Sequence, residues 1–203
     1  PAGLTLKLNN GAAYATSTAV TATIGLTDTE TTGYQMKIWG VAGAETEAEA
    51  AWATFAESKA ITLTTGDGQK TVSIKVRDDV GNETETVTAK ITLDTAVPVV
   101  TITGPDKSKI SKVATFNVSA FSFSANVDFE EYKIKVVPSE SSLENAGTQI
   151  PVTAGSTNTS GTEGGYKADT AINVTINGAD LEAASAGDGV KIVKVFVKNA
   201  AGT

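Results

Sequence analysis

The 203-residue chain contains no cysteine and no histidine. Disulfide frameworks, thiolate zinc sites, haem ligation, Ser-His-Asp triads and Cys-His dyads all depend on one of these two residues. Their absence excludes most of the familiar catalytic and metal-binding chemistry. Oxygen ligands remain, and calcium is the metal that suits a site made only of oxygen ligands.

Basic side chains and long apolar runs are also scarce. The chain has 16 Lys and Arg against 23 Asp and Glu, which gives a net charge of -7. A nucleic-acid-binding surface normally carries a basic stripe, so we expect no nucleic-acid partner. No run of about 18 apolar residues is present, so we expect no membrane insertion, and the opening PAGLTLKL lacks the regions of a signal peptide.

The pattern that dominates the sequence is an alternation of apolar and polar residues with a period of two. This period places successive side chains on opposite faces of a β-strand. The alternating runs of the first half lie at residues 4–8, 20–26, 34–38, 61–63, 71–77 and 86–93. About six or seven such strands in roughly 100 residues is the spacing of a β-sandwich, so we predict an all-β fold.

One stretch, AETEAEAAWATFAESK at residues 44–59, departs from this pattern. It is rich in Ala and Glu, and Thr46 with Glu49 has the spacing of a capping box. The sequence therefore predicts one short helix in the first half, with Trp52 and Phe55 on a face that packs against the sandwich.

The two halves of the chain contain a repeat. GDGQKTVSIKVRDDVGN at residues 66–82 recurs as GDGVKIVKVFVKNAAGT at residues 187–203. The repeat keeps the Gly-Asp-Gly turn, the lysine two residues later, the alternating apolar positions and the closing glycine. We therefore predict two tandem β-sandwich domains, residues 1–97 and 98–203, joined at the segment DTAVP.

The second domain differs from the first by an insertion of about 25 residues, located at about 138–186. This region is rich in Ser, Gly, Thr and Asn. We expect one strand within it, at Ile172–Ile176, and a long exposed loop at residues 153–165.

The positions at which the chain starts and stops within the repeat predict a longer tandem array of such domains. Pro1 stands at the same phase as Pro98, so we expect a further repeat before it. The first repeat continues beyond its closing glycine into the strand at 85–94, whereas the second stops at Thr203. We expect the second domain to lack its last strand, and the following polypeptide to supply it, because an incomplete sandwich exposes unpaired backbone.

These motifs resemble those of the bacterial immunoglobulin-like repeats that occur in tandem in bacterial surface proteins and in phage tail and virion proteins. The resemblance is close over residues 50–104, in the Gly-Asp-Gly turn, the strand ending in Arg77-Asp78, and the Asp94-Thr95 junction with Pro98. It implies immunoglobulin-like sandwiches on a virion or cell surface that act as spacer and subunit contact. The alternative is an adhesion module that binds a receptor or host-surface glycan through the insertion loop.

Two groups of acidic residues are candidate calcium ligands. The first group is Asp78, Asp79, Asn82 and Glu83 on one turn, together with Asp94, which an immunoglobulin-like fold places near that turn. Short polar residues also dominate turns for backbone reasons, and the EF-hand spacing is absent, which favours the turn interpretation and a chain without cofactors. The second group, Asp128, Glu130 and Glu131, is better explained as a solvated edge.

Several apolar residues of the second domain fall on the outer face of its strands. Phe196 lies between Lys194 and Lys198, and Ile192 shares its face. Phe121 and Phe123 lie an odd number of residues after Phe116, so in a continuous strand they face the side opposite to Phe116. The candidate interface residues are Ile192, Phe196, Phe121 and Phe123. Two interpretations stay open for this face: a contact with another subunit, or cover by the insertion of the same domain.

An enzymatic role is not expected. Paired carboxylates about 5 to 10 Å apart can hydrolyse glycosides in a cleft, but nothing in the sequence indicates a cleft. Aromatic residues, which would form sugar platforms, make up 6% of the chain.

Overall fold

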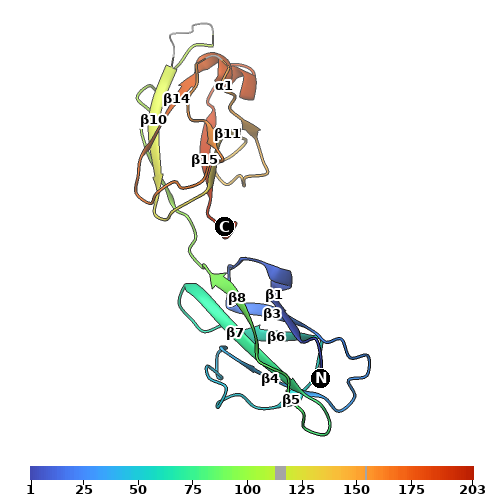
Figure 1. Ribbon diagram of the computed structural model, residues 1–203. Helices are drawn as coiled ribbons and strands as arrows, with labels where there is room; N and C mark the ends of the chain where they lie inside the picture. The colour runs from blue at the N-terminus through green and yellow to red at the C-terminus, as the bar shows by residue number, and fades with distance from the viewer. Residues whose placement is uncertain (113–117, 154) are drawn as a thin grey trace. The chain divides into compact units, whose positions relative to one another are not determined.

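The computed structural model describes residues 1–112, 118–153 and 155–203. The chain divides into two compact units, Pro1–Thr95 and Ala96–Thr203, and the division falls within the segment DTAVP. Strands dominate both units (Figure 1), so the prediction of an all-β chain is confirmed. The helical elements of the described residues are a 3-10 turn, η1 (Asn9–Gly11), and one α-helix, α1 (Gly178–Ala184).

Unit 1 consists of two sheets whose side chains form one core. The sheet orders are β1-β3-β6 and β2-β8-β7-β4-β5. In chain order the strands are β1 (Thr5–Leu8), β2 (Tyr14–Ala15), β3 (Ala19–Gly25), β4 (Gln35–Trp39), β5 (Ala53–Thr54), β6 (Ser58–Thr62), β7 (Gly68–Arg77) and β8 (Val87–Leu93). The alternation in the sequence is the origin of this core, because Val72, Ile74 and Val76 of β7 are fully buried.

Unit 2 also has two sheets around one core. One has the order β14-β10-β9, and in the other β11 pairs with β12, β13 and β15. In chain order the strands are β9 (Val100–Thr103), β10 (Val118–Ala125), β11 (Glu131–Val137), β12 (Thr148–Gln149), β13 (Ser160–Gly161), β14 (Ile172–Asn177) and β15 (Ile192–Lys198). The strand expected at Ile172–Ile176 is confirmed as β14.

The predicted helix at residues 44–59 is wrong. Glu49 accepts the Thr46 backbone N–H at 2.8 Å, as in a capping box, but the chain makes only turns there. Ala53 and Thr54 then form β5, which pairs with β4. Strand pairing therefore overrides the local helix propensity of this Ala- and Glu-rich segment. Among the described residues the α-helix lies instead at α1, where the Asn177 side chain accepts the Ala179 N–H at 2.8 Å as an N-cap.

The internal repeat is reproduced in hydrogen bonds. Lys70 donates to the Thr65 carbonyl at 3.0 Å, and its counterpart Lys191 donates to the Ala186 carbonyl at 3.2 Å. In both copies the lysine ammonium therefore reaches back to the carbonyl five residues earlier, across the Gly-Asp-Gly turn. The equivalence of β7 and β15 thus extends from the sequence to side-chain contacts.

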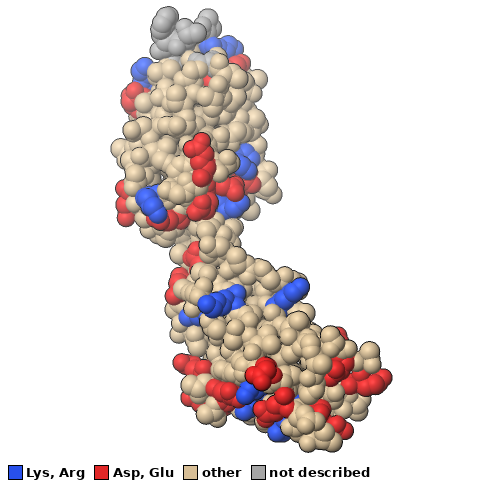
Figure 2. Space-filling view, in the orientation of Figure 1, with Lys and Arg blue, Asp and Glu red and all other residues tan. Residues whose placement is uncertain are grey.

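The part of the chain that the structure describes contains no helix with the length and hydrophobicity needed to cross a membrane. On the face shown in Figure 2, acidic and basic side chains are interspersed on each unit and do not form one basic stripe. Phe116, which served as the phase reference for Phe121 and Phe123, lies outside the described residues.

Candidate functional site

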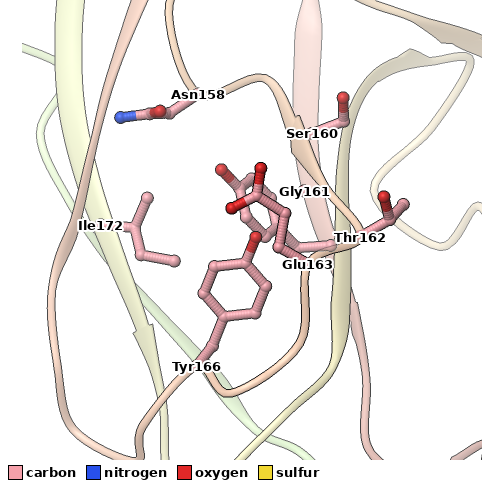
Figure 3. Close-up of a pocket in the computed structure, with 8 residues that line it drawn as sticks. Asn158, Ser160, Gly161, Thr162, Glu163, Tyr166 and Ile172 are labelled. Atoms are coloured by element: carbon pink, nitrogen blue, oxygen red, sulfur yellow. The ribbon is translucent and has the colours of Figure 1, made fainter.

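The insertion of unit 2 forms a pocket of about 380 Å³. Its wall is built where β13 pairs with β11 and where the Phe129 and Tyr166 backbones bridge at 3.0 and 3.1 Å. The lining residues are Tyr132, Asn158, Ser160, Gly161, Thr162, Glu163, Tyr166 and Ile172. In Figure 3, Tyr166 and Glu163 lie in the middle of this group, with Asn158, Ile172 and Thr162 around them.

Aromatic packing holds the tyrosines of the pocket in place. Tyr166 stacks on Phe129 with 5.0 Å between ring centroids, and its ring meets Tyr132 edge-on at 5.2 Å. A Cβ added at Gly161 would lie 2.1 Å from the Tyr166 hydroxyl, so only glycine fits between β13 and these rings. The aromatic side of the pocket is therefore closely packed.

The polar groups of the pocket are hydrogen-bonding groups without a fixed charge, apart from Glu163. Burial raises the pKa of Tyr132, and the nearby Tyr166 and Glu163 act in the same direction, so its hydroxyl stays protonated at neutral pH. The Asn158 amide donates to the Asn173 carbonyl at 2.7 Å, which fixes the rim. The half-buried Tyr166 ring beside hydroxyl, amide and carboxylate groups suits a small polyhydroxylated ligand.

The sequence predicts an exposed loop at residues 153–165, and most of the described residues there are exposed. The structure differs from that expectation at Ser156 and Thr159, which are buried, and at β13, which pairs with the sheet. Tyr166 stands one residue beyond that segment and was not singled out. Its position at the end of a Gly-, Ser- and Thr-rich stretch is the signal that marks it.

The structure does not bring together the first group of calcium candidates. Asp94 follows β8 at the end that pairs with Gly68, whereas Asp78 follows the opposite end of β7. Ten residues of strand separate these ends by about 30 Å. Asp78 Oδ2 accepts the Asn82 side-chain amide at 2.7 Å, and Asp79 is exposed. No group of three or more acidic side chains suited to a metal occurs among the residues described.

The second acidic group consists of side chains with separate partners. Asp128 accepts from Lys167 at 2.7 Å, and Glu131 pairs with Lys198 at 2.8 Å. Glu130 accepts the Gly165 N–H at 3.3 Å. The hydrogen bond from Lys167 holds the pKa of Asp128 below its usual value. These carboxylates link the start of β11 to the end of β15 and to the loop before β14.

The insertion reaches the face of β15 that carries Phe196 and Ile192. Lys194 donates to the carbonyls of Glu140 and Ser142, both at 2.7 Å, and its ammonium lies 5.3 Å from the Phe196 ring centroid. Lys133, which pairs with Phe196 across the sheet, forms an ion pair with Glu144 at 2.8 Å. Residues of the same unit therefore cover part of this face, and Phe196 is half-buried.

The two phenylalanines of β10 point toward the interior of unit 2. Phe123 is 1% exposed and belongs to the core, so it is not available to contact another subunit. Phe121 is half-buried and lines a groove between the sheets. The expectation that both lie on an outer face is wrong, because odd-numbered residues of β10 face inward.

Comparisons with known proteins give little to compare with this site. No family model and no curated protein matches the chain. One of the solved structures that match is the chitinase ChiA74 from Bacillus thuringiensis, at 15% sequence identity and a TM-score of 0.31. The match covers 85% of this chain and 25% of the chitinase, so the chain spans about a quarter of that enzyme's length.

The match to an enzyme contradicts the expectation that the chain is not an enzyme, and that expectation is withdrawn. A likeness at this TM-score carries no argument about fold or activity, so it assigns no reaction to the chain.

Proposed function

We propose that the chain is a structural and interaction module of a larger assembly, built from two tandem immunoglobulin-like β-sandwiches. Its role is that of a spacer and subunit contact. The resemblance to bacterial immunoglobulin-like repeats supports this proposal and points to a phage virion or a bacterial cell surface, where the partners are other protein subunits.

The observation that carries the proposal is the pairing of the two ends of unit 1. β2 runs parallel to β8, and the backbone N–H groups of Thr92 and Asp94 donate to the carbonyls of Ala13 and Ala15, each at 2.9 Å. Tension between the ends of the unit pulls these parallel segments in opposite directions along their length. The hydrogen bonds are then loaded together and do not open one after another, as a spacer under tension requires.

Single-molecule pulling on the chain, anchored at Pro1 and Thr203, tests this role. We expect two separate unfolding steps, because each unit has its own core. Asp94→Pro removes the N–H that binds Ala15 and should lower the unfolding force of unit 1 alone. Asp94→Ala keeps that N–H and is the matched control. A single step, or equal forces for the two variants, would contradict the proposal.

A second candidate function is glycan binding, and the pocket around Tyr166 is the observation that favours it. The proposed ligand is a host-surface glycan, recognised by the half-buried Tyr166 ring and by hydrogen bonds to Asn158 and Glu163. In this case the insertion serves adhesion, and the rest of the chain presents it.

A glycan array distinguishes the two candidate functions. We expect signal for a defined sugar class that is lost in Tyr166→Ala and in Glu163→Ala, the second of which changes an exposed side chain. Tyr14→Ala, at a 40% exposed tyrosine of unit 1, is the control that keeps the signal. No signal for the unaltered chain would rule out glycan binding and leave the spacer role.

A further inference from the structure

The last strand of unit 2 has one paired edge. In unit 1, β7 lies between β4 and β8, so both of its edges are paired. Its repeat counterpart β15 pairs with β11, and no second strand partner occurs within the described ranges 1–112, 118–153 and 155–203. The other edge of β15 therefore presents unpaired backbone groups, which are a template for strand addition.

β15 has 7 residues and β7 has 10, and the missing residues are those that would pair at the unpaired edge. β7 begins at Gly68, and its first residues, Gly68 to Lys70, pair only with β8, because β4 pairs from Ser73 onward. The matching residues 189–191 precede β15, which begins at Ile192. Residues 189–191, which would pair with a strand at this edge, therefore lie outside the sheet. Val190 in this segment is 96% exposed.

An apolar groove of about 690 Å³ lies beside this edge. One wall carries Ile102, Phe121 and Ile176 of the sheet β14-β10-β9. The opposite wall includes Lys191 and Val193 of the β15 segment. A groove between the two sheets, lined by these apolar residues and bordered by lysines and Asp188, is suited to receive further apolar side chains.

Unit 1 shows what fills the corresponding space. Gly68, Lys70 and Val72 of β7 pair with Leu93, Ile91 and Ala89 of β8. Leu93 and Ile91 are 1% and 2% exposed and belong to the core. Through the repeat, the three β7 residues correspond to Gly189, Lys191 and Val193, all of which line the groove. The groove is therefore the place that the apolar residues of a β8-like strand would occupy.

A side chain at the end of this segment adds chemical specificity. In unit 1, Asp67 Oδ1 accepts the Thr95 backbone N–H at 3.1 Å and its hydroxyl at 2.8 Å, directly after β8. The counterpart Asp188 is exposed and has no hydrogen-bond or ion-pair partner among the residues that the structure describes. A threonine at the end of an added strand would supply both donors.

We infer that the groove beside β15 binds an extended strand of a partner polypeptide, antiparallel to β15. The strand carries apolar side chains at alternate positions, which fill the groove, and a threonine at the position of Thr95, which binds Asp188. This inference stands apart from the proposed function, because a strand can complete the sheet of a spacer or of an adhesion module alike.

A fluorescein-labelled peptide with the sequence of residues 86–95, TVTAKITLDT, is the probe for the 203-residue chain. We expect saturable binding by fluorescence anisotropy, with slower hydrogen exchange of the amides at 189–195. Ile102→Asp, at a 46% exposed groove residue, should weaken binding about tenfold or more. Leu143→Asp, at a 73% exposed residue outside the groove, should leave binding unchanged.

Two altered peptides test the apolar side chains and the threonine. A peptide with Ile91→Asp and Leu93→Asp should not bind, because the two side chains that correspond to buried core residues of β8 are then charged. Thr95→Ala in the peptide should weaken binding about fivefold, and Asp188→Ala in the chain should remove that difference.

Absence of saturable binding, or equal binding of the peptide with Ile91→Asp and Leu93→Asp, would overturn the inference. Equal affinity of the Ile102→Asp chain would do the same. Sedimentation of the unliganded chain tests whether a second copy of the chain occupies the groove. A dimer whose 189–195 amides are already protected from hydrogen exchange would mean that it does.

Discussion

Asp78 and Asn199 occupy the same position of the repeated turn, one in each unit, and make equivalent hydrogen bonds. Asp78 Oδ1 accepts the Asn82 N–H at 2.7 Å, and Asn199 Oδ1 accepts the Thr203 N–H at 2.8 Å. Their backbone N–H groups bond to the carbonyls of those same residues, at 3.0 and 2.9 Å. An aspartate and an asparagine thus support one turn geometry, because each offers an oxygen acceptor at the same place.

This relationship predicts that Asp78→Asn keeps the turn but removes its acid sensitivity. Hydrogen bonds from Asn82, the side-chain amide first, hold the pKa of Asp78 below its usual value. A lowered pKa contributes stability above the unfolded-state pKa of about 3.9, and this stability is lost as pH falls through the folded-state pKa.

Thermal melts between pH 7 and pH 2, followed by tryptophan fluorescence, test the prediction. Both tryptophans, Trp39 and Trp52, belong to unit 1, so this signal reports on that unit. We expect Asp78→Asn to lose less melting temperature below pH 4 than the unaltered chain. Identical acid profiles would show that the Asp78 carboxylate does not titrate with unfolding.

The register of β7 predicts opposite results for neighbouring residues. Ile74 is fully buried, so Ile74→Asp places a charge in the core and should destabilise unit 1 by several kcal/mol. Lys75 faces outward and pairs with Glu47 at 3.0 Å, so Lys75→Met should cost at most about 1 kcal/mol. Urea titration with tryptophan fluorescence measures both, and similar losses would contradict the assigned face.

We expect unit 2 to be less stable than unit 1. Its core is separate and contains a cluster of aromatic rings, but β15 has an unpaired edge within the described residues. Calorimetry of the whole chain should show two transitions, and the one without a tryptophan signal should come first. A single transition, or a first transition that coincides with the fluorescence change, would refute this order.

Phe196→Ala separates the two interpretations of the outer face of β15. Because Lys194 and the segment Glu140–Ser142 lie over this region, we expect a stability loss of about 1 to 2 kcal/mol in unit 2. Association with other subunits should stay unchanged. Calorimetry measures the first effect and sedimentation the second. Weakened association at unchanged stability would instead support a subunit contact through Phe196.

The sequence predicted most of the strands because their side chains alternate in polarity where one face is buried. The repeat of residues 66–82 also predicts equivalent strands in the two units. The sequence could not predict β5 or the pocket around Tyr166. The two residues of β5 are too few for a periodic pattern, and the pocket depends on residues as distant in sequence as Tyr132 and Ile172.

What the sequence by itself determined is the all-β class, the position of the junction and the equivalence of β7 with β15, since all three follow from local periodicity and self-similarity. The tertiary structure decided which segments meet. Part of the segment with helix propensity pairs with β4 as β5. Asp78 and Asp94 lie at opposite ends of the β7–β8 pair, and Phe123 is buried in the core. Pairing across a sheet depends on residues far apart in the chain, so local pattern cannot determine it.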